Sequence, residues 1–156
     1  MDETAKSIGT PMPAFAGAPG VCLCARARAA ARRLTAHYDA HLEAHGVTLP
    51  QFGLLATIAA AGEAPIAQIA ATVALDPSTL SRTLAPLVAA GLVESLTDPS
   101  NRRARIVRLT ADGRQKVNAA GRAWAKAQNT AAALIDAEAV GAVYRQTKAL
   151  EGAGRG

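Results

Sequence analysis

The sequence predicts a mainly α-helical domain that contains one small β-hairpin. The chain has 156 residues, of which 50% are hydrophobic, enough to bury one core of ordinary size. Only 3% of the residues are aromatic, and alanine and leucine dominate, a composition that favours helices over strands. Signals that start and stop helices recur along the chain and are interrupted once, near residue 100, by two short extended segments around an Asp-Pro turn.

The first predicted helix is long and covers about residues 21–45, a segment rich in alanine and arginine. It is expected to end at Gly46, because glycine readily adopts the left-handed conformation that follows many helices. Residues 1–19 are rich in proline, glycine and alanine and predict a flexible arm, and residues 151–156 predict a flexible tail. The single domain is therefore expected to cover residues 20–150.

Two shorter helices follow. Thr48 with Gln51 three residues later resembles a capping box at the start of the second helix. After Gly62, Pro65 suits the first turn of a third helix. The apolar residues expected to face the core are Phe52, Leu55 and Ile58 in the second helix and Ile66, Ile69 and Val73 in the third.

The fourth predicted helix has an unusual outer face. Asp76 is a good N-cap and Pro77 a good first helical residue, and Gly91 closes the helix. Its apolar positions, at the spacing of one buried face, are Leu80, Leu84, Leu87 and Val88. This arrangement turns short hydroxyls and one arginine outward, namely Ser78, Thr79, Ser81, Arg82 and Thr83.

A hairpin and two helices complete the chain. Segments 92–96 and 104–110 predict two strands around a turn whose tip carries Arg102 and Arg103. Thr110 is expected to cap a fifth helix, and a sixth runs roughly from Asp136 to Leu150.

Helix, turn, exposed helix and basic hairpin form the order of a winged helix-turn-helix, here at about residues 48–110. An exposed helix of this kind fits a major groove of DNA, where Ser and Thr bond base edges or phosphates and Arg82 can bind guanine O6 and N7 together. Arginines on the hairpin suit a narrow minor groove, and a formal net charge of +5 fits a polyanionic partner. Two alternatives remain: the hydroxyls only cap and solubilise the helix, or the exposed helix binds a protein.

Several other classes have little support in the sequence. There is no glycine-rich phosphate loop, nucleophile elbow or carboxylate pair in a catalytic context, so we expect neither an enzyme nor a cofactor. No secretory signal and no apolar run of membrane-spanning length is found, which predicts a cytoplasmic protein with reduced cysteines and no membrane partner.

Two stretches of the chain resemble a known protein family. The stretches TLPQFGLLATI and DPSTLSRTLAPLVAAGLVESLTDPSNRRARIVRLTADG, with the long helices at both ends, look like the MarR family of bacterial transcription regulators from Val21 to Leu150. The resemblance implies a homodimer in which the helices at about 21–45 and 111–150 intertwine. It also implies a repressor that binds a pseudo-palindromic operator in double-stranded DNA and is released by a small molecule or an oxidant.

The resemblance assigns the DNA contacts residue by residue. The recognition helix corresponds to Asp76–Ala90. In the wing, the family pattern Asp-x-x-Asp-x-Arg falls on Asp98, Asn101 and Arg103, so Arg103 would enter the minor groove and Asp98 would brace the wing. Asn101 departs from the pattern, since it can accept a hydrogen bond but cannot form an ion pair. The full set of expected DNA contacts is Ser78, Thr79, Ser81, Arg82, Arg102, Arg103 and Arg105.

The first helix carries a possible redox sensor. Cys24 lies 24 residues before Thr48, a spacing similar to that of the reactive cysteine in the organic-hydroperoxide-sensing branch of the family, and Tyr38 falls where that branch has a tyrosine. Arg28 stands where a second tyrosine is expected, and an arginine one turn from a thiol favours the thiolate. Cys22 cannot readily pair with Cys24 within one helix, so a disulfide would have to cross the dimer.

Other interpretations of these side chains stay open. Both cysteines can be small hydrophobic residues at a dimer interface. His37, His41 and His45 recur every four residues, but without a matching Cys or Glu cluster we expect a solvated helix end and no metal. Tyr38, Phe52 and Trp124 could line a pocket for a small aromatic acid, with simple packing as the alternative for Trp124.

Overall fold

The structure is a computed structural model that describes residues 22–73 and 75–150. The arm at 1–19 and the tail at 151–156 lie outside the described residues. The chain divides into two compact units, with the boundary between Thr35 and Ala36. The winged-helix elements all lie in the second unit.

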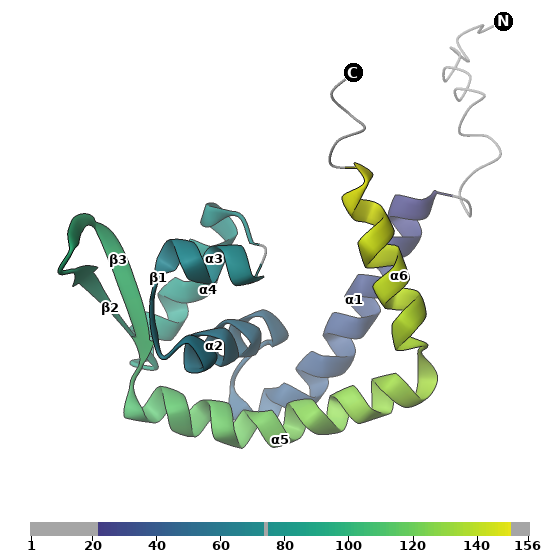
Figure 1. The fold of residues 1–156 in the computed structure, drawn as a ribbon. Helices are drawn as coiled ribbons and strands as arrows, with labels where there is room; N and C mark the ends of the chain where they lie inside the picture. The colour runs from purple at the N-terminus through teal and green to yellow at the C-terminus, as the bar shows by residue number, and fades with distance from the viewer. Residues whose placement is uncertain (1–21, 74, 151–156) are drawn as a thin grey trace, which may run out of the picture. The chain divides into compact units, whose positions relative to one another are not determined.

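The described chain is mainly helical with a small antiparallel sheet, as the sequence predicts (Figure 1). In chain order the elements are α1 Leu23–Leu42, a 3₁₀ turn Glu43–His45, α2 Leu49–Ala61, β1 Glu63–Pro65, α3 Ile66–Val73, α4 Pro77–Ala89, β2 Val93–Asp98, β3 Asn101–Leu109, α5 Ala111–Leu134 and α6 Ala137–Lys148.

The ends of the helices follow local signals. The backbone N–H of Thr48 donates to the side-chain oxygen of Gln51 at 2.9 Å, and the backbone N–H of Gly113 donates to Oγ1 of Thr110 at 2.9 Å. Gly46 has a φ of 65°, as expected for the residue that ends the first helical segment. That segment is shorter than predicted, since α1 stops at Leu42 and its last turn tightens into the 3₁₀ geometry common at helix ends.

The sheet has three strands in the order β1-β3-β2, so the two-stranded hairpin of the sequence prediction was incomplete. Pro65 was expected in the first turn of a helix but ends β1, where Glu63 pairs with Arg108. An edge strand tolerates a proline because one side of it needs no ladder hydrogen bond.

The hairpin is longer and less regular than predicted. β2 and β3 pair regularly from Val93 opposite Leu109 to Thr97 opposite Arg105. The next pair joins Asp98 to Asn101, which leaves residues 102–104 of β3 without a cross-strand partner. The wing therefore ends in a bulge, the kind of irregularity that redirects side chains at the end of a strand pair.

One apolar core holds the winged-helix elements together. Leu80, Leu84 and Leu87 from α4 are at least 92% buried, since their exposed fractions are 3%, 8% and 2%. Val88, which was expected to face inward, is 38% exposed, because the three leucines already fill the buried stripe and Val88 falls on its edge. The predicted core residues Phe52, Leu55, Ile58 and Ile69 are buried, and Ile66 and Val73 pack against the same core.

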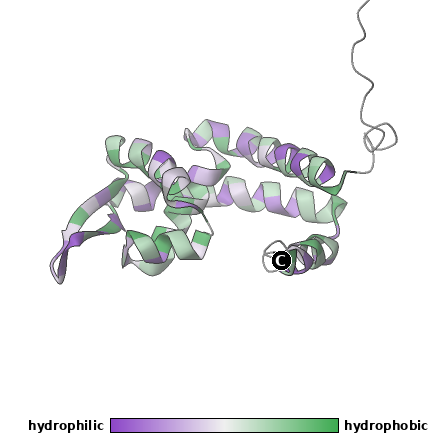
Figure 2. Ribbon diagram, turned by 90° about the horizontal axis from the view of Figure 1, so that it is seen from above, coloured by the Kyte–Doolittle hydropathy of each residue, from purple (hydrophilic) through white to green (hydrophobic). Residues whose placement is uncertain are grey.

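The distribution of hydropathy along the chain also fits a winged helix. Hydrophilic residues gather at the tip of the hairpin, whereas the helices contain both hydrophilic and hydrophobic residues (Figure 2). None of the helices in the described ranges is both long and apolar enough to cross a bilayer.

Candidate nucleic-acid interface

The outer face of α4 is polar because its leucines all point the other way. Ser78, Ser81 and Arg82 are exposed and Thr79 is half-buried. These four are the residues predicted to contact DNA from this helix, and the structure places them on two successive turns at its N-terminal end.

The Asp76 carboxylate organises this first turn. Its Oδ1 accepts hydrogen bonds from the backbone N–H groups of Ser78 and Thr79 at 3.0 Å each, and from the Ser78 hydroxyl at 2.6 Å. Its Oδ2 accepts the Thr79 hydroxyl at 2.6 Å. The hydrogen bonds from the two hydroxyls, first Ser78 and then Thr79, hold the pKa of Asp76 well below its usual value. Both hydroxyl protons are thus committed to Asp76, and the oxygens keep free lone pairs for other donors.

Arg82 lies one turn further along the same face. Its Nη2 atom is 3.4 Å from Oγ of Ser78, a long hydrogen bond in which the serine oxygen accepts. This contact leaves most of the donors of the guanidinium available, because the group has five N–H bonds.

The predicted bracing residues of the wing make local hydrogen bonds. Oδ1 of Asp98 accepts the hydroxyl of Ser100 at 2.6 Å and its backbone N–H at 2.8 Å. These bonds, the hydroxyl first, lower the pKa of Asp98. Oδ1 of Asn101 accepts the backbone N–H of Arg103 at 3.1 Å. Both side chains therefore bind neutral groups of the turn.

The four arginines of β3 fall into two pairs. Arg108 forms ion pairs with Glu94 at 2.7 Å and Glu63 at 3.4 Å, one on each neighbouring strand, and the bond to Glu94 is the main reason that the pKa of Arg108 is raised. Arg105 donates from Nε to Oγ of Ser95 at 3.2 Å and from Nη2 to the backbone carbonyl oxygen of Ser95.

The other pair consists of Arg102 and Arg103, in the bulge at the tip of the wing. Arg102 and Arg103 are exposed, and within residues 22–73 and 75–150 their guanidinium groups have no ion-pair or hydrogen-bond partner. Of the three wing arginines expected to contact DNA, Arg105 is thus the one whose guanidinium is already engaged. Arg108 was missed in the sequence, since its role depends on β1 joining the sheet.

The three aromatic residues predicted to line a pocket do meet, at the contact of α1, α2 and α5. The Trp124 ring lies 6.5 Å from that of Tyr38 and 6.1 Å from that of Phe52, centroid to centroid, with 29° between the planes in both pairs. The Tyr38 hydroxyl donates to the side-chain oxygen of Gln128. The rings stack on one another, which is the packing alternative for Trp124.

The histidines of α1 take part in the same contact. Nε2 of His37 donates to the carbonyl of Ala127 at 3.0 Å, and Nδ1 of His41 donates to the carbonyl of His37 at 2.9 Å. His37 is half-buried, so it is not part of the solvated helix end that the sequence suggested. No group of three potential metal ligands occurs among the described residues.

Both cysteines are exposed free thiols in the first unit. Cys24 lies in the first turn of α1, and Arg28 is exposed one turn later. Cys22 precedes the helix, which corrects the expectation that both cysteines lie within it.

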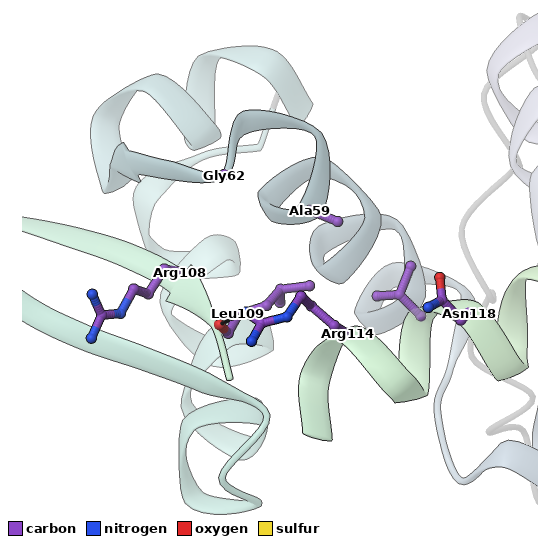
Figure 3. Close-up of a pocket in the computed structure, with 7 residues that line it drawn as sticks. Ala59, Gly62, Arg108, Leu109, Arg114 and Asn118 are labelled. Carbon is purple, nitrogen blue, oxygen red and sulfur yellow. Dashed lines mark hydrogen bonds between the residues drawn. The ribbon is translucent and has the colours of Figure 1, made fainter. Parts of the chain in front are cut away.

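The structure also contains a cavity that the sequence did not indicate. It has a volume of about 310 Å³ and lies where the end of α2, the end of β3 and the start of α5 meet (Figure 3). Nη1 of Arg114 donates to the carbonyl of Leu109 at 2.9 Å beside it. No sequence signal locates it, because three separate elements form it. Its lining residues are Ala59, Gly62, Arg108, Leu109, Arg114, Val117 and Asn118.

The order α2, α3, exposed α4 and basic β-hairpin defines a winged helix-turn-helix. Residues 47–104 match the model of the MarR family. Among solved structures, the chain is similar to the transcriptional regulator MosR of M. tuberculosis in complex with DNA, with 28% identity, a TM-score of 0.77, and coverage of 85% of this chain and 98% of that one. A second crystal structure of MosR gives 29% identity, a TM-score of 0.71, and coverage of 85% of this chain and 97% of that one.

A mutant of E. coli MarR complexed with operator DNA shares the fold, at 21% identity and a TM-score of 0.71, with coverage of 83% and 94%. No curated protein matches the chain. The family match over residues 47–104 and the similarity to MosR agree, and the winged helix-turn-helix of this chain is similar to that of the MarR family. Members of this family are transcriptional regulators, which are generally not enzymes.

Proposed function

We propose that this protein is a homodimeric transcriptional repressor that binds a pseudo-palindromic operator in double-stranded DNA. The observation that carries the proposal is the polar face of α4, with Arg82, next to a wing whose exposed Arg102 and Arg103 lack internal partners in the described chain. The same fold is similar to that of MosR in its complex with DNA.

In this proposal α4 enters the major groove and the wing reaches the neighbouring minor groove. Arg82 binds a guanine edge, and the oxygens of Ser78 and Thr79 accept hydrogen bonds from base amino groups. Ser81 is exposed, and its hydroxyl donates to a phosphate oxygen. Arg103 enters the minor groove, and Arg102 binds the phosphate backbone.

Exposed apolar side chains support the homodimer. Leu134 at the end of α5 is 81% exposed, and Val140, Val143 and Tyr144 on α6 are 50%, 55% and 60% exposed. A monomer would leave this apolar surface in water, whereas a second copy would bury it. Two subunits then present two α4 helices to the two halves of one operator.

Release of the repressor has two candidate triggers. Oxidation would act at Cys24, an exposed thiol in the first turn of a helix with Arg28 one turn away. A small aromatic ligand would act at the cluster of Tyr38, Phe52 and Trp124, because parting these stacked rings would change how α1, α2 and α5 pack.

A titration of duplex DNA with the protein at two salt concentrations tests the proposed DNA-binding function. The DNA comes from the neighbourhood of the protein's own gene, and the protein is either reduced or treated with an organic hydroperoxide. Saturable binding that weakens steeply with salt supports the repressor, since phosphate contacts release counterions. Binding that is weak and nearly insensitive to salt would favour the alternative, a winged-helix module that contacts protein.

Two serine variants separate the triggers. If oxidation releases the DNA, Cys24→Ser retains binding in the presence of hydroperoxide, while Cys22→Ser, the matched control, still loses it. If hydroperoxide has no effect on the wild type, the search moves to aromatic acids, with Trp124→Ala as the variant that should no longer respond.

A further inference from the structure

Arg105 is the wing arginine whose geometry departs most from its expected role. Its Nε donates to Oγ of Ser95 at 3.2 Å and its Nη2 donates to the carbonyl oxygen of the same residue. The guanidinium fork thus binds one residue of the neighbouring strand through two parallel bonds. This bidentate geometry is specific to arginine, since the ammonium of lysine is a point charge without a fork.

The contact between Arg105 and Ser95 lies where the regular part of the hairpin ends. The pair Thr97 and Arg105 is the last regular rung of the β2–β3 ladder before the bulge at residues 102–104. Ser95 lies diagonally across from Arg105 on the same face of the sheet, where long side chains can reach. The fork of Arg105 therefore fixes β3 to β2 directly at the base of the bulge.

The other arginines of β3 differ from Arg105 in their charged partners and in their position on the strand. Arg108, further down the strand, is neutralised by Glu63 and Glu94. Arg102 and Arg103 are in the bulge itself and are exposed. The way in which the bulge leaves the regular ladder sets the direction in which Arg102 and Arg103 project. Arg105 holds the two strands together at that point.

We propose that Arg105 is a positioning residue of the wing, which acts through Ser95 to aim Arg102 and Arg103 and does not itself contact DNA. The proposal rests on the proposed function, because it concerns how the wing is prepared for DNA. A bulge held in one direction before binding avoids the entropy cost of ordering it in the complex.

The test is a titration of a fluorescein-labelled duplex, selected by the wild-type protein from random-sequence DNA, over a series of salt concentrations. Arg105→Lys keeps the charge but removes the fork, so we expect binding about tenfold weaker with an unchanged salt slope. Ser95→Ala removes one of the two bonds, and we expect about a threefold loss. Both variants should keep the melting temperature of the wild type within about 2 °C, since the contact is exposed.

Arg108 provides the matched control on the same strand, because it is paired with Glu63 and Glu94 and lies on the side of Arg105 away from the bulge. Arg108→Lys should therefore bind within about twofold of the wild type. Arg102→Ala should reduce the salt slope by about 0.9, the value for one lost phosphate contact.

Two results would overturn the positioning role. One is Arg105→Lys binding as tightly as the wild type while Arg105→Ala reduces the salt slope by about 0.9, which would make Arg105 a direct phosphate contact. The other is Ser95→Ala binding as tightly as or more tightly than the wild type. If the wild type selects no duplex at all, the proposed function itself fails and the positioning role fails with it.

Discussion

The Thr79 hydroxyl donates a hydrogen bond to Oδ2 of Asp76 at 2.6 Å, while the other carboxylate oxygen, Oδ1, accepts the helix-capping N–H groups. Oδ1 caps α4 and also accepts the Ser78 hydroxyl, whereas Oδ2 accepts only the Thr79 hydroxyl among the described residues and sets the direction of that proton on the proposed DNA-binding face. A change confined to Oδ2 can therefore alter the binding face without removing the cap.

Asp76→Asn makes this change if its amide oxygen takes the place of Oδ1. The amide nitrogen then donates to Thr79, whose own proton becomes free to donate to a base or phosphate. The variant also removes a negative charge from the face proposed to meet DNA, so we expect tighter binding, a steeper salt slope and an altered base preference. The measurements are duplex titration and selection from random-sequence DNA.

The matched control for Asp76→Asn is Asp136→Asn. Oδ1 of Asp136 accepts the backbone N–H groups of Glu138 and Ala139 at the start of α6, so it caps a helix outside the proposed interface. The control removes the same charge from a comparable N-cap. Equal effects of both variants on base preference would contradict the assigned role of Asp76.

The pH dependence of stability should also report on Asp76 and on Asp98. The folded state lowers the pKa of both side chains. A lowered pKa means that the contribution to stability is fully present above the ordinary aspartate value of about 3.9 and is lost as the pH falls towards the lowered pKa. We therefore expect the urea midpoint to fall between about pH 5 and pH 2. The double variant Asp76→Asn/Asp98→Asn should show a smaller fall, and an equal fall would count against these two groups as its source.

Arg82 and Arg103 should affect DNA binding in different ways. Loss of a bidentate guanine contact removes discrimination between bases, so Arg82→Ala should reduce the preference for the selected duplex over random DNA by about tenfold. Arg103→Ala should weaken binding to both duplexes to a similar extent. Competition titrations with the two duplexes measure this difference. The assignment of α4 and the wing to DNA fails if neither variant changes the affinity.

Much of the fold follows from signals that act within one turn of chain. Asp76 and Thr110 cap the helices that the sequence assigns to them, and Gly46 ends the first helical segment with a positive φ. Each of these contacts joins residues at most three positions apart, so periodicity and capping rules suffice to find them. The exposed face of α4 follows in the same way from the spacing of its leucines.

The parts that the sequence did not reveal depend on distant residues. Strand β1 has three residues and exists only because it pairs with β3, 45 residues later at the contact of Glu63 with Arg108. The role of Arg105 likewise depends on the register of β2 and β3 and on the bulge that follows. Strand register at this range cannot be derived from local patterns, since several pairings satisfy the same alternation of residues.

Gly113 lies at the tightly packed junction between the wing and α5. A methyl group at Gly113 would lie 2.0 Å from the backbone oxygen of Leu92, which also accepts the backbone N–H of Thr110 at 3.1 Å. Backbone cannot yield as a flexible side chain can, so Gly113→Ala should lower the free energy of unfolding by about 1–3 kcal/mol. Gly121 provides the control on the same helix, because a methyl group there meets no described atom within 4 Å apart from the backbone of its own helical turns. Gly121→Ala should raise the free energy of unfolding by about 0.5–1 kcal/mol through helix propensity alone. Urea unfolding followed by circular dichroism measures both values, and a Gly113→Ala variant as stable as Gly121→Ala would mean that α5 does not approach Leu92 this closely.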